Sequence, residues 1–457
     1  MSRGSPWVEL ITAESPESRF VRYRRIIRFP QLTMPLLAAY TPEHWRVTHT
    51  DEIVQEVRFD RPYSLVAITA NTAAAPHAYR LAARFRERRI PVVIGGPHAT
   101  LMPDEVGLHA DAVVVGEGER VWPQLLDDAE NGRLQARYSG GTVTDLKGMP
   151  PPRWDLIKGR AYGRGVTIAT RGCPYACEYC SIPAMYGRRM RFRPIAEIVD
   201  EVRHMPGRAL ILWDDNLGAN REYAKELFAA ITPLRRWWTS QATADVAFDE
   251  EFLALAAASG CRALFFGLES VSQASLDHTN KRHNRVARYP EAIQRMHAHG
   301  IAVQAGIVFG FDDDDRSTFR ATVDFLRDAA VDSATIGVLV PYPNTPLFRR
   351  LENEGRILTR DWSKYDGKKH VVFQPARMSP EDLLMGVEWA AREFYSLSSI
   401  AARLRMSRTG LWWNVVRNLG YHLALRKFGP IGHSPDQLGS VLDRYDFYRS
   451  SKAVEET

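Results

Sequence analysis

Short apolar runs alternate with longer amphipathic stretches along the first 145 residues. Apolar runs of strand length occupy residues 8–13, 45–52, 64–69, 91–96 and 111–117. Helical periodicity appears between them, most clearly at 34–41 and 75–89. Runs that are apolar throughout are typical of strands buried on both faces, as in a parallel sheet covered by helices. Residues 1–145 are therefore predicted to form a Rossmann-like parallel-sheet domain of about five strands.

Residues 146–165, "LKGMPPPRWDLIKGRAYGRG", interrupt this alternation. The segment has three consecutive prolines, several glycines and no apolar period, which is typical of a linker. The alternation then resumes. Predicted strands lie at 166–170, 209–215, 237–243, 263–270, 302–311 and 334–343, with helical patterns at 195–205, 221–231, 249–259, 289–300 and 317–330. Six such units predict a partial TIM-like (β/α) barrel over residues 166–375, whose chemistry lies at the carboxyl ends of its strands.

Residues 376–457 form a predicted helical C-terminal region, so the whole chain is of the α/β class. Within it, "GLWWNVVRNLGYHLALRKFG" (410–429) has an aromatic and aliphatic face interrupted by Arg417, Arg426 and Lys427. We expect this helix to pack its aromatic face on the barrel. The alternative is a helix that lies on a membrane surface or covers a lipid-like substrate.

Composition and charge narrow the class of protein. The chain has 457 residues, of which 45% are hydrophobic, enough for ordinary buried cores. The N-terminus lacks the build of a signal peptide, and no apolar run approaches the roughly 18 residues of a spanning helix. The expectation is a cytoplasmic protein without an integral membrane segment.

The net charge of +6 is modest, and the basic residues are scattered. The densest groups are at 19–29 and 187–193. A nucleic-acid-binding protein would normally show a stronger basic stripe. We therefore interpret the basic residues as mostly solvated surface and expect no nucleic-acid partner.

Three of the four cysteines lie within "RGCPYACEYC" (171–180), at the spacing C-x3-C-x2-C. They are too clustered for a disulfide framework in a large domain, and thiolates suit zinc or iron–sulfur clusters. Structural zinc requires four ligands, and the nearby sequence has no fourth histidine or cysteine at such spacing. Cys173, Cys177 and Cys180 are therefore predicted to hold a 4Fe-4S cluster with one open iron. Cys261 is predicted to be a buried, inert thiol.

The cysteine motif, with Tyr179 before its last cysteine and directly after the first barrel strand, resembles that of the radical S-adenosylmethionine (SAM) enzymes. The resemblance implies that SAM chelates the open iron and that one electron cleaves it to a 5′-deoxyadenosyl radical. It also implies an electron donor such as flavodoxin or ferredoxin. Residues 340–348, which end the sixth strand with a proline-rich turn, border the active site in relatives.

The same resemblance assigns SAM contacts to the ends of barrel strands. Asp214 and Asp215 follow the second strand, Glu269 and Ser270 follow the fourth, and Gly306 lies in the fifth. For Asp214 and Asp215, capping of the following helix is an equal alternative.

The N-terminal domain is similar to the cobalamin-binding domain that precedes the barrel in many of these enzymes. The resemblance rests on "IPVVIGGPHATLMPDE" (90–105) followed by "ADAVVVGEGE" (110–119). Glycines at strand ends allow the backbone to pass close to a ligand over the sheet edge, although a GG-P-H turn is often structural. The cobalamin contacts that the resemblance implies are Thr69, Thr72, Gly95, Gly96, His98, Gly116 and Glu117.

One departure concerns the cobalt ligand. Cobalamin proteins that hold cobalt from below with histidine have D-x-H-x-x-G, and this string is absent from the chain. The loop at 69–80 is the expected neighbour of the lower cobalt face. His77 and His98 are candidate contacts, but a surface or capping histidine is the preferred interpretation of each.

The implied function is a cobalamin-dependent C-methyltransferase that acts on an unactivated carbon through a 5′-deoxyadenosyl radical and methylcobalamin. No side-chain base reaches such a proton, whose acidity lies outside the range that proteins tune. Two alternatives stay open, an oxidative cyclase or rearrangement enzyme like the anaerobic magnesium-protoporphyrin ester cyclase, and a non-catalytic cobalamin or iron–sulfur sensor. The substrate is expected to be a small molecule, with lipid-like compounds, tetrapyrroles and natural products all open.

Overall fold

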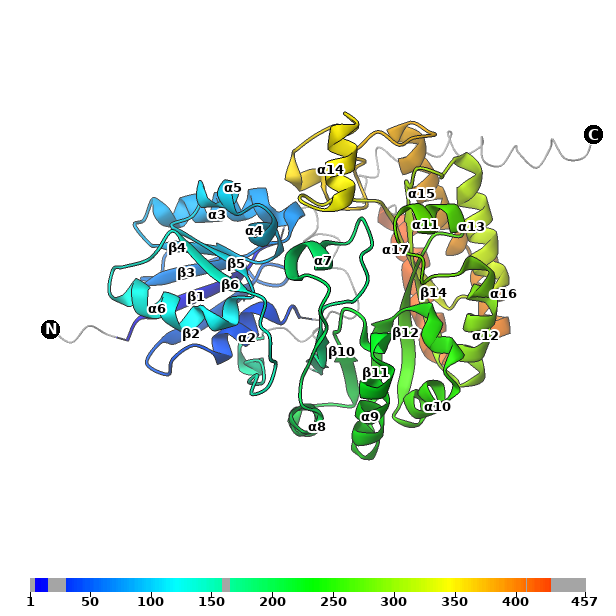
Figure 1. The fold of residues 1–457 in the computed structure, drawn as a ribbon, viewed down its shortest axis with the longest axis horizontal. Helices are drawn as coiled ribbons and strands as arrows, with labels where there is room; N and C mark the ends of the chain where they lie inside the picture. The colour runs from blue at the N-terminus through cyan, green and yellow to red at the C-terminus, as the bar shows by residue number, and fades with distance from the viewer. Residues whose placement is uncertain (1–4, 15–29, 158–164, 408, 429–457) are drawn as a thin grey trace, which may run out of the picture. The chain divides into compact units, whose positions relative to one another are not determined.

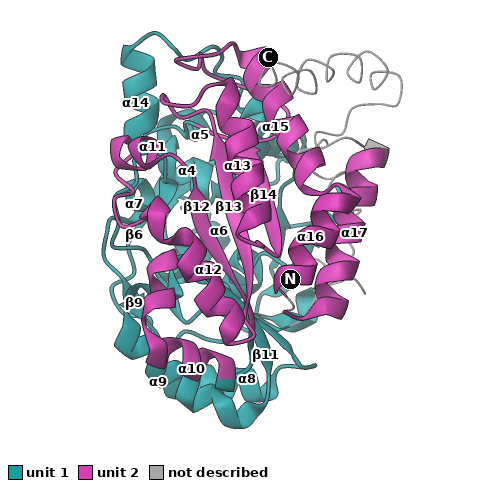
Figure 2. Cartoon of the chain, turned by 90° about the vertical axis from the view of Figure 1, so that its right-hand side faces the viewer, with its two compact units in different colours: residues 1–242, 258–261, 341–366 teal, residues 243–257, 262–340, 367–457 magenta. Residues whose placement is uncertain are grey.

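The computed structural model describes two compact units. The first comprises residues 1–242, 258–261 and 341–366, and the second comprises 243–257, 262–340 and 367–457 (Figure 2). The described residues are 5–14, 30–157, 165–407 and 409–428. The basic group at 19–29 lies outside them, as does part of the predicted linker.

The first unit begins with a sheet of six parallel strands, in the order β2-β1-β3-β4-β5-β6 (Figure 1). The strands are β1 (Trp7–Thr12), β2 (Arg46–Asp51), β3 (Leu65–Thr69), β4 (Val92–Gly95), β5 (Ala112–Gly116) and β6 (Arg137–Gly141). The first five confirm the prediction. The edge strand β6 was not predicted, because its sequence RYSGG contains no apolar run.

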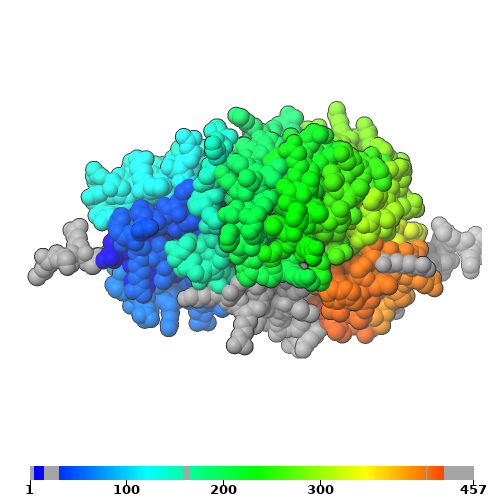
Figure 3. Space-filling view, turned by 90° about the horizontal axis from the view of Figure 1, so that it is seen from below, coloured from blue at the N-terminus to red at the C-terminus, as the bar shows by residue number. Residues whose placement is uncertain are grey.

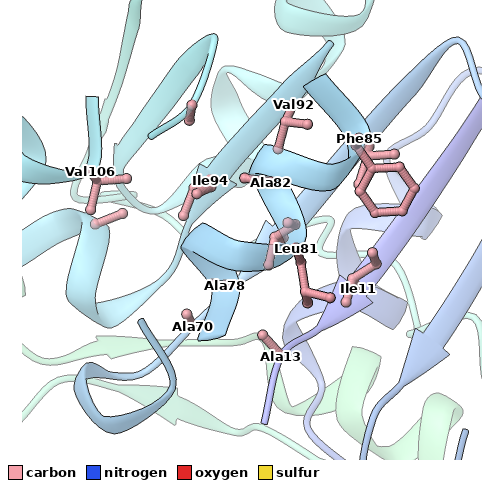
Figure 4. Close-up of a cluster of buried hydrophobic side chains, with 14 of the residues drawn as sticks. Ile11, Ala13, Ala70, Ala78, Leu81, Ala82, Phe85, Val92, Ile94 and Val106 are labelled. Carbon is pink, nitrogen blue, oxygen red and sulfur yellow. The ribbon is translucent and has the colours of Figure 1, made fainter. Parts of the chain in front are cut away.

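Helices cover both faces of this sheet. They are α2 (Thr33–Ala39), α3 (Ala75–Arg86), α4 (Pro97–Leu101), α5 (Pro103–Gly107) and α6 (Trp122–Glu130). Successive residues of β1 point to opposite faces, so Ile11 packs beside Phe85 in one buried cluster (Figure 4) and Leu10 beside Trp122 in another. Burial on both faces explains why β3, β4 and β5 read as apolar runs, whereas the edge strand β2, RVTHTD, is mostly polar and only partly buried.

A second six-stranded sheet has the order β14-β13-β12-β11-β10-β7, which supports the predicted barrel strands. The strands are β7 (Val166–Thr167), β10 (Ala209–Leu212), β11 (Trp237–Ala242), β12 (Cys261–Glu269), β13 (Ala302–Phe309) and β14 (Ser333–Val338). The helices that follow the predicted patterns are α8 (Ile195–His204), α9 (Arg221–Ile231), α10 (Glu250–Ala258), α12 (Tyr289–Ala298) and α13 (Arg316–Asp328). Shorter helices are α7 (Ser181–Tyr186), α11 (Gln273–His278) and α14 (Pro346–Asn353).

The first predicted barrel strand, 166–170, is divided in the structure. Only β7 joins the large sheet, whereas β8 (Thr170–Arg171) pairs antiparallel with β9 (Arg191–Phe192). At the break, the backbone amides of Ala169 and Thr170 donate hydrogen bonds to the side chain of Asp214 and not to a neighbouring strand. The chain therefore leaves the sheet just before the cysteine motif.

Up to residue 428, where the described part of the chain ends, the C-terminal region of the second unit contains three helices. They are α15 (Pro380–Phe394), α16 (Leu397–Ser407) and α17 (Leu411–Phe428), and α16 lies beside α17 (Figure 2). The expectation that α17 packs its aromatic face on the barrel is wrong. Trp412 is 70% exposed, whereas Asn414 and Asn418 are fully buried. The buried carboxylate of Asp332 needs donors, and the polar side of α17 supplies one of them, from Asn414.

Among the described residues, no helix has both the length and the apolar character needed to cross a bilayer.

Candidate functional site

The β8–β9 pair closes the base of the loop that carries the three clustered cysteines. Thr170 lies opposite Phe192 and Arg171 opposite Arg191. Within the loop Cys177 is buried, while Cys173 and Cys180 are partly exposed, and none forms a disulfide. The backbone amide of Cys180 donates to the carbonyl of Cys177 at 3.1 Å, which turns the chain between these two thiols.

Gly172 is required where the loop leaves β8. Its φ is +90°, and a Cβ atom there would lie 2.5 Å from the carbonyl oxygen of Arg189. A side chain at this position would therefore be strained by its backbone and would collide with the returning strand. The residue directly before Cys173 thus fixes how tightly the loop closes.

Three consecutive residues after β10 hold the start of the cysteine loop. Asp214 accepts bonds from the amides of Ala169, at 3.0 Å, and Thr170. Asp215 accepts from the amide of Gly172 at 2.7 Å, and the side-chain amide of Asn216 lies 3.8 Å from Cys173 Sγ. Burial raises the pKa of Asp214 to about 7 and also raises the pKa of Asp215.

The capping alternative for Asp214 and Asp215 is wrong. Helix α9 is capped by Asn220, whose side chain accepts from the amide of Tyr223. Their assignment as SAM contacts stays a prediction. The observed bonds show that both carboxylates position the cysteine loop.

The donor set fits a cluster better than a single metal ion. No three histidine, cysteine or carboxylate side chains in the described part of the chain are grouped to hold one ion. A cubane takes one thiolate per iron and so needs its ligands further apart than zinc does. Beside Cys173, the buried side-chain oxygen of Asn216 has no hydrogen-bond partner among the described residues, so a polar acceptor is available there.

Two arginines of the β8–β9 pair bind carboxylates that follow β5. Glu117 accepts from Arg171 at 3.1 Å and from Arg191, whose side chain is 1% exposed. Arg171 also donates to Glu119 at 2.6 Å. Burial opposes the charge of Arg171, but the two glutamates outweigh it and raise the pKa of the guanidinium. The carboxylate of Glu117, a predicted cobalamin contact, is thus bound by the base of the cysteine loop.

The segment 341–366 contacts the cysteine loop and the first sheet. The amide of Leu347 donates to the carbonyl of Glu178, and Arg350 pairs with the carboxylate of Glu178 at 2.7 Å. The side-chain amide of Asn344 donates to the carbonyl of Leu101 in α4. Sequence reasoning placed 340–348 near the active site but missed Glu178, whose partner lies 172 residues away.

The carboxyl edge of the first sheet collects the predicted cobalamin contacts. Its strand order reverses direction between β1 and β3, and doubly wound sheets bind ligands outside such a switch point. Thr69 ends β3 at this point, and Thr72 begins the following short helix; both are buried. Gly95 ends β4, Gly96 follows it at the start of α4, and Gly116 ends β5.

Two of these glycines have structural causes within the sheet. Gly96 has a φ of +93°, and a Cβ atom there would lie 2.4 Å from the hydroxyl of Thr69. Gly116 has a φ of +81°, and its Cβ would lie 2.3 Å from the carbonyl of Gly141. Their contact with a cofactor stays a prediction.

Both candidate histidines of this domain are hydrogen-bonded to protein groups. His77 lies 2.9 Å from both carboxylate oxygens of Glu52. His98 is 1% exposed and bonds Tyr79 at 3.1 Å, with Glu105 at 3.5 Å. The preferred interpretation as a surface or capping histidine is therefore wrong for His98, which is buried and bonded to side chains, and the ring of His77 is held by Glu52.

In the second unit, the predicted SAM contacts surround the end of β12. Glu269 has a φ of +66°, at an irregularity in the pairing of β12, and its carboxylate binds Lys281 at 2.8 Å. A non-glycine residue held there indicates a position fixed by its surroundings. Ser270 is buried and accepts from the amide of Ser272, and a Cβ on Gly306 would lie 2.6 Å from the ring of Phe265. Cys261, the first residue of β12, is 2% exposed, as predicted.

Comparison with known families matches both halves of the chain. The radical SAM superfamily matches residues 167–350, and the B12 binding domain matches residues 35–126. Bacteriochlorophyllide d C-12(1)-methyltransferase of Chlorobaculum tepidum is 31% identical over 84% of this chain and 86% of its own length. Bacteriochlorophyllide d C-8(2)-methyltransferase of the same organism is 27% identical over 76% of this chain and 82% of its own length. The anaerobic magnesium-protoporphyrin IX monomethyl ester cyclase of Cereibacter sphaeroides is 28% identical over 78% and 64%.

Two solved structures share the fold. The methyltransferase TsrM from Kitasatospora setae, with cobalamin and a [4Fe-4S] cluster bound, gives a TM-score of 0.65 at 18% identity, over 84% of this chain and 88% of that one. The cobalamin-dependent SAM radical enzyme OxsB, with aqua-cobalamin and SAM bound, gives a TM-score of 0.67 at 14% identity. The match covers 98% of this chain and 75% of that one.

Proposed function

The chain belongs to the cobalamin-dependent methyltransferase family of the radical SAM superfamily, and from this membership we propose that it methylates an unactivated carbon of a tetrapyrrole. The cofactors of the family are a 4Fe-4S cluster, SAM and cobalamin. The observation that carries the substrate proposal is that two similar relatives are named as bacteriochlorophyllide d methyltransferases.

When bound, the cluster and SAM supply a carbon-centred radical, and cobalamin supplies the methyl group. Cys173, Cys177 and Cys180 are proposed to hold the cluster. Gly172, Asp214 and Asp215 support this role, because they fix the backbone of the chain just before Cys173. Cys261 takes no part, because it lies at the opposite end of a strand from the predicted SAM contacts.

Contacts to SAM are proposed for Asp214 and Asp215 in the first unit and, separately, for Glu269, Ser270 and Gly306 in the second unit. Asp214 accepts its hydrogen bonds from backbone amides through one carboxylate oxygen. Its other oxygen has no hydrogen-bond partner among the described residues. A buried acceptor of this kind suits an ammonium group. Glu269, held by Lys281, supplies a second fixed carboxylate.

Cobalamin is proposed to cover the switch point of the first sheet, against Thr69, Thr72 and the glycines at 95, 96 and 116. His98 and Glu117 would then act mainly as positioning residues, since their polar atoms bind Tyr79 and the two arginines. With His77 on Glu52, neither histidine is a free ligand for cobalt. Because the chain has no D-x-H-x-x-G string, no histidine of that motif would hold the cofactor.

An electron donor such as flavodoxin or ferredoxin, and a cytoplasmic location, complete the proposal. Thiolate ligands survive in a reducing compartment, and the four cysteines form no disulfide.

We also propose the domain boundaries at 145, 165 and 375, as the sequence pattern indicates.

The substrate class is tested with reconstituted enzyme under anaerobic conditions. A bacteriochlorophyllide, a hopanoid lipid and a magnesium-protoporphyrin ester are each supplied with SAM and a reductant. Methylation of the bacteriochlorophyllide alone supports the proposal. Methylation of the hopanoid alone contradicts it, and so does a cyclised product from the porphyrin ester.

A further inference from the structure

Helix α17 presents its polar side to the protein interior. Asn414 and Asn418, four residues apart, are both fully buried. The amide of Asn414 donates to Asp332 at 3.0 Å, and that of Asn418 donates to the carbonyl of Asp332 at 2.9 Å. Arg403 of α16, also fully buried, donates to the side chain of Asn418 at 3.0 Å. These contacts fix the rotation of α17, because turning it would break the hydrogen bonds of both asparagines and leave their buried amides without those partners.

The apolar side of α17 consequently faces outward. Leu411, Val415, Leu419 and Leu423 recur every four residues along one side of the helix, and Trp412 and Val416 lie beside them. All six are exposed, from 38% for Val415 to 70% for Trp412. Of the twelve exposed large hydrophobic residues in the described chain, eight lie on α16 and α17. Figure 3 shows these C-terminal helices, in orange, at the molecular surface.

The charge of this region has one sign. No aspartate or glutamate occurs from residue 394 to residue 428, whereas the same stretch contains five arginines and a lysine. Arg405 and Arg426 are exposed on the same two helices as the apolar residues. An exposed apolar strip beside basic side chains, without acids, is complementary to a lipid surface with anionic headgroups.

We propose that α16 and α17 dock in the plane of a bilayer that contains anionic lipid. The apolar strip of α17, defined by the six residues above, would enter the boundary between headgroups and acyl chains. The exposed side chains of Arg405 and Arg426 would lie at the level of the lipid phosphates. The buried asparagines keep the opposite side of α17 on the protein, so the helix lies on the membrane and does not cross it.

A second copy of the chain fits this surface less well. A two-fold interface pairs this surface with itself, so the basic side chains of one copy would face a surface of α16 and α17 that contains no acid to offset them. Lipid binding is independent of which reaction the enzyme catalyses.

The test is co-sedimentation of the full cluster-loaded chain with vesicles of phosphatidylcholine, with and without phosphatidylglycerol. We expect binding that requires phosphatidylglycerol and weakens with added salt. The variant Val416→Asp/Leu423→Asp should lower binding by about tenfold or more, because both side chains leave the apolar strip. The variant Arg405→Gln/Arg426→Gln should lose the preference for phosphatidylglycerol.

The matched controls are Leu108→Asp and Leu358→Asp, which alter residues that are 77% and 52% exposed in the other unit. They should bind vesicles as the unchanged chain does. Cluster absorbance and melting temperature confirm that each variant is folded. Absence of binding by the unchanged chain, or equal losses in the controls, would overturn the proposal. So would a dimer that Val416→Asp/Leu423→Asp dissociates, without vesicle binding.

Discussion

The thiols of the cysteine loop differ from Cys261 in exposure and position. Replacing Cys173, Cys177 or Cys180 by alanine should abolish the 4Fe-4S absorbance after reconstitution, because three ligands are the minimum for a site with one open iron. Cys261→Ala is the matched control and should retain the full spectrum, since its thiol is 2% exposed. A normal spectrum in all three loop variants would refute the assignment.

The loop also depends on a residue without a side chain. Gly172→Ala should lower the iron and sulfide bound per chain, because the new Cβ would lie 2.5 Å from the carbonyl of Arg189. Gly187→Ala is the control: it too has a positive φ, of +74°, but its Cβ would meet nothing within 4 Å. Both changes also cost about 1–3 kcal/mol in backbone strain, because an alanine side chain disfavours the positive φ at each position. Equal cluster loading in the two variants would show that the contact with Arg189 is unimportant.

The sequence predicted local residues better than distant partners. The cysteine spacing is readable within eight residues, and Asp214 and Asp215 follow an apolar strand. By contrast, Glu117 and Arg191 are 74 residues apart, and Glu178 and Arg350 are 172 residues apart. Such pairs leave no periodicity or spacing, because they arise only when separate elements meet.

At the scale of elements, the end of β5 and the β8–β9 pair are joined by buried charges. Glu117→Ala removes a carboxylate from both arginines. Arg191 would keep a hydrogen bond to the backbone carbonyl of Val143, and Arg171 would keep Glu119 as its carboxylate partner. Removing one partner of a buried pair typically costs about 3–5 kcal/mol, so the free energy of unfolding in urea should fall by that order. Glu119→Ala should cost less, because Arg171 keeps Glu117. Equal, small losses in both would contradict a central role for Glu117.

Glu105 of α5 joins the first sheet domain to the segment 341–366. Burial alone would raise the pKa of Glu105, but hydrogen bonds from His98, Trp362 and Tyr79 outweigh it and lower the pKa to about 2, from an ordinary 4.5. The folded state therefore binds fewer protons than the unfolded state between these values. The ionised carboxylate of Glu105 therefore contributes to the stability of the folded state above pH 4.5, and this contribution is lost as the pH falls towards 2.

Glu105→Gln should accordingly lower the free energy of unfolding at neutral pH by about 1–3 kcal/mol and flatten the acid limb of the stability curve. The neighbouring Asp104, 91% exposed, supplies the control: Asp104→Asn should change stability by less than about 1 kcal/mol. Denaturant unfolding across this pH range is the measurement. An unaltered acid limb in Glu105→Gln would contradict the role given to its hydrogen bonds.

Elements with a strong apolar pattern were predictable, and those fixed by polar contacts were not. Strands β1, β3, β4 and β5 of the first sheet appear where their apolar runs predict them, and the mostly polar edge strand β2 also lies within its predicted residues. Strand β6 and the break between β7 and β8 do not, because β6 lacks an apolar run and the break is held by Asp214. The orientation of α17 was mispredicted because apolar residues usually face inward, whereas Asp332 selects the polar side.

For the whole molecule, two cofactor-binding halves lie on one chain, as family comparison shows. The sequence predicted this arrangement, since both halves carry local motifs. The substrate leaves no such motif, and its proposed class rests on the names of relatives.

The most direct test of the central claim is turnover of reconstituted enzyme with SAM labelled in its methyl group, in the presence of a bacteriochlorophyllide. The account predicts 5′-deoxyadenosine and S-adenosylhomocysteine in equal amounts, and a product that carries the label on carbon. Formation of 5′-deoxyadenosine without S-adenosylhomocysteine and without labelled product would contradict it.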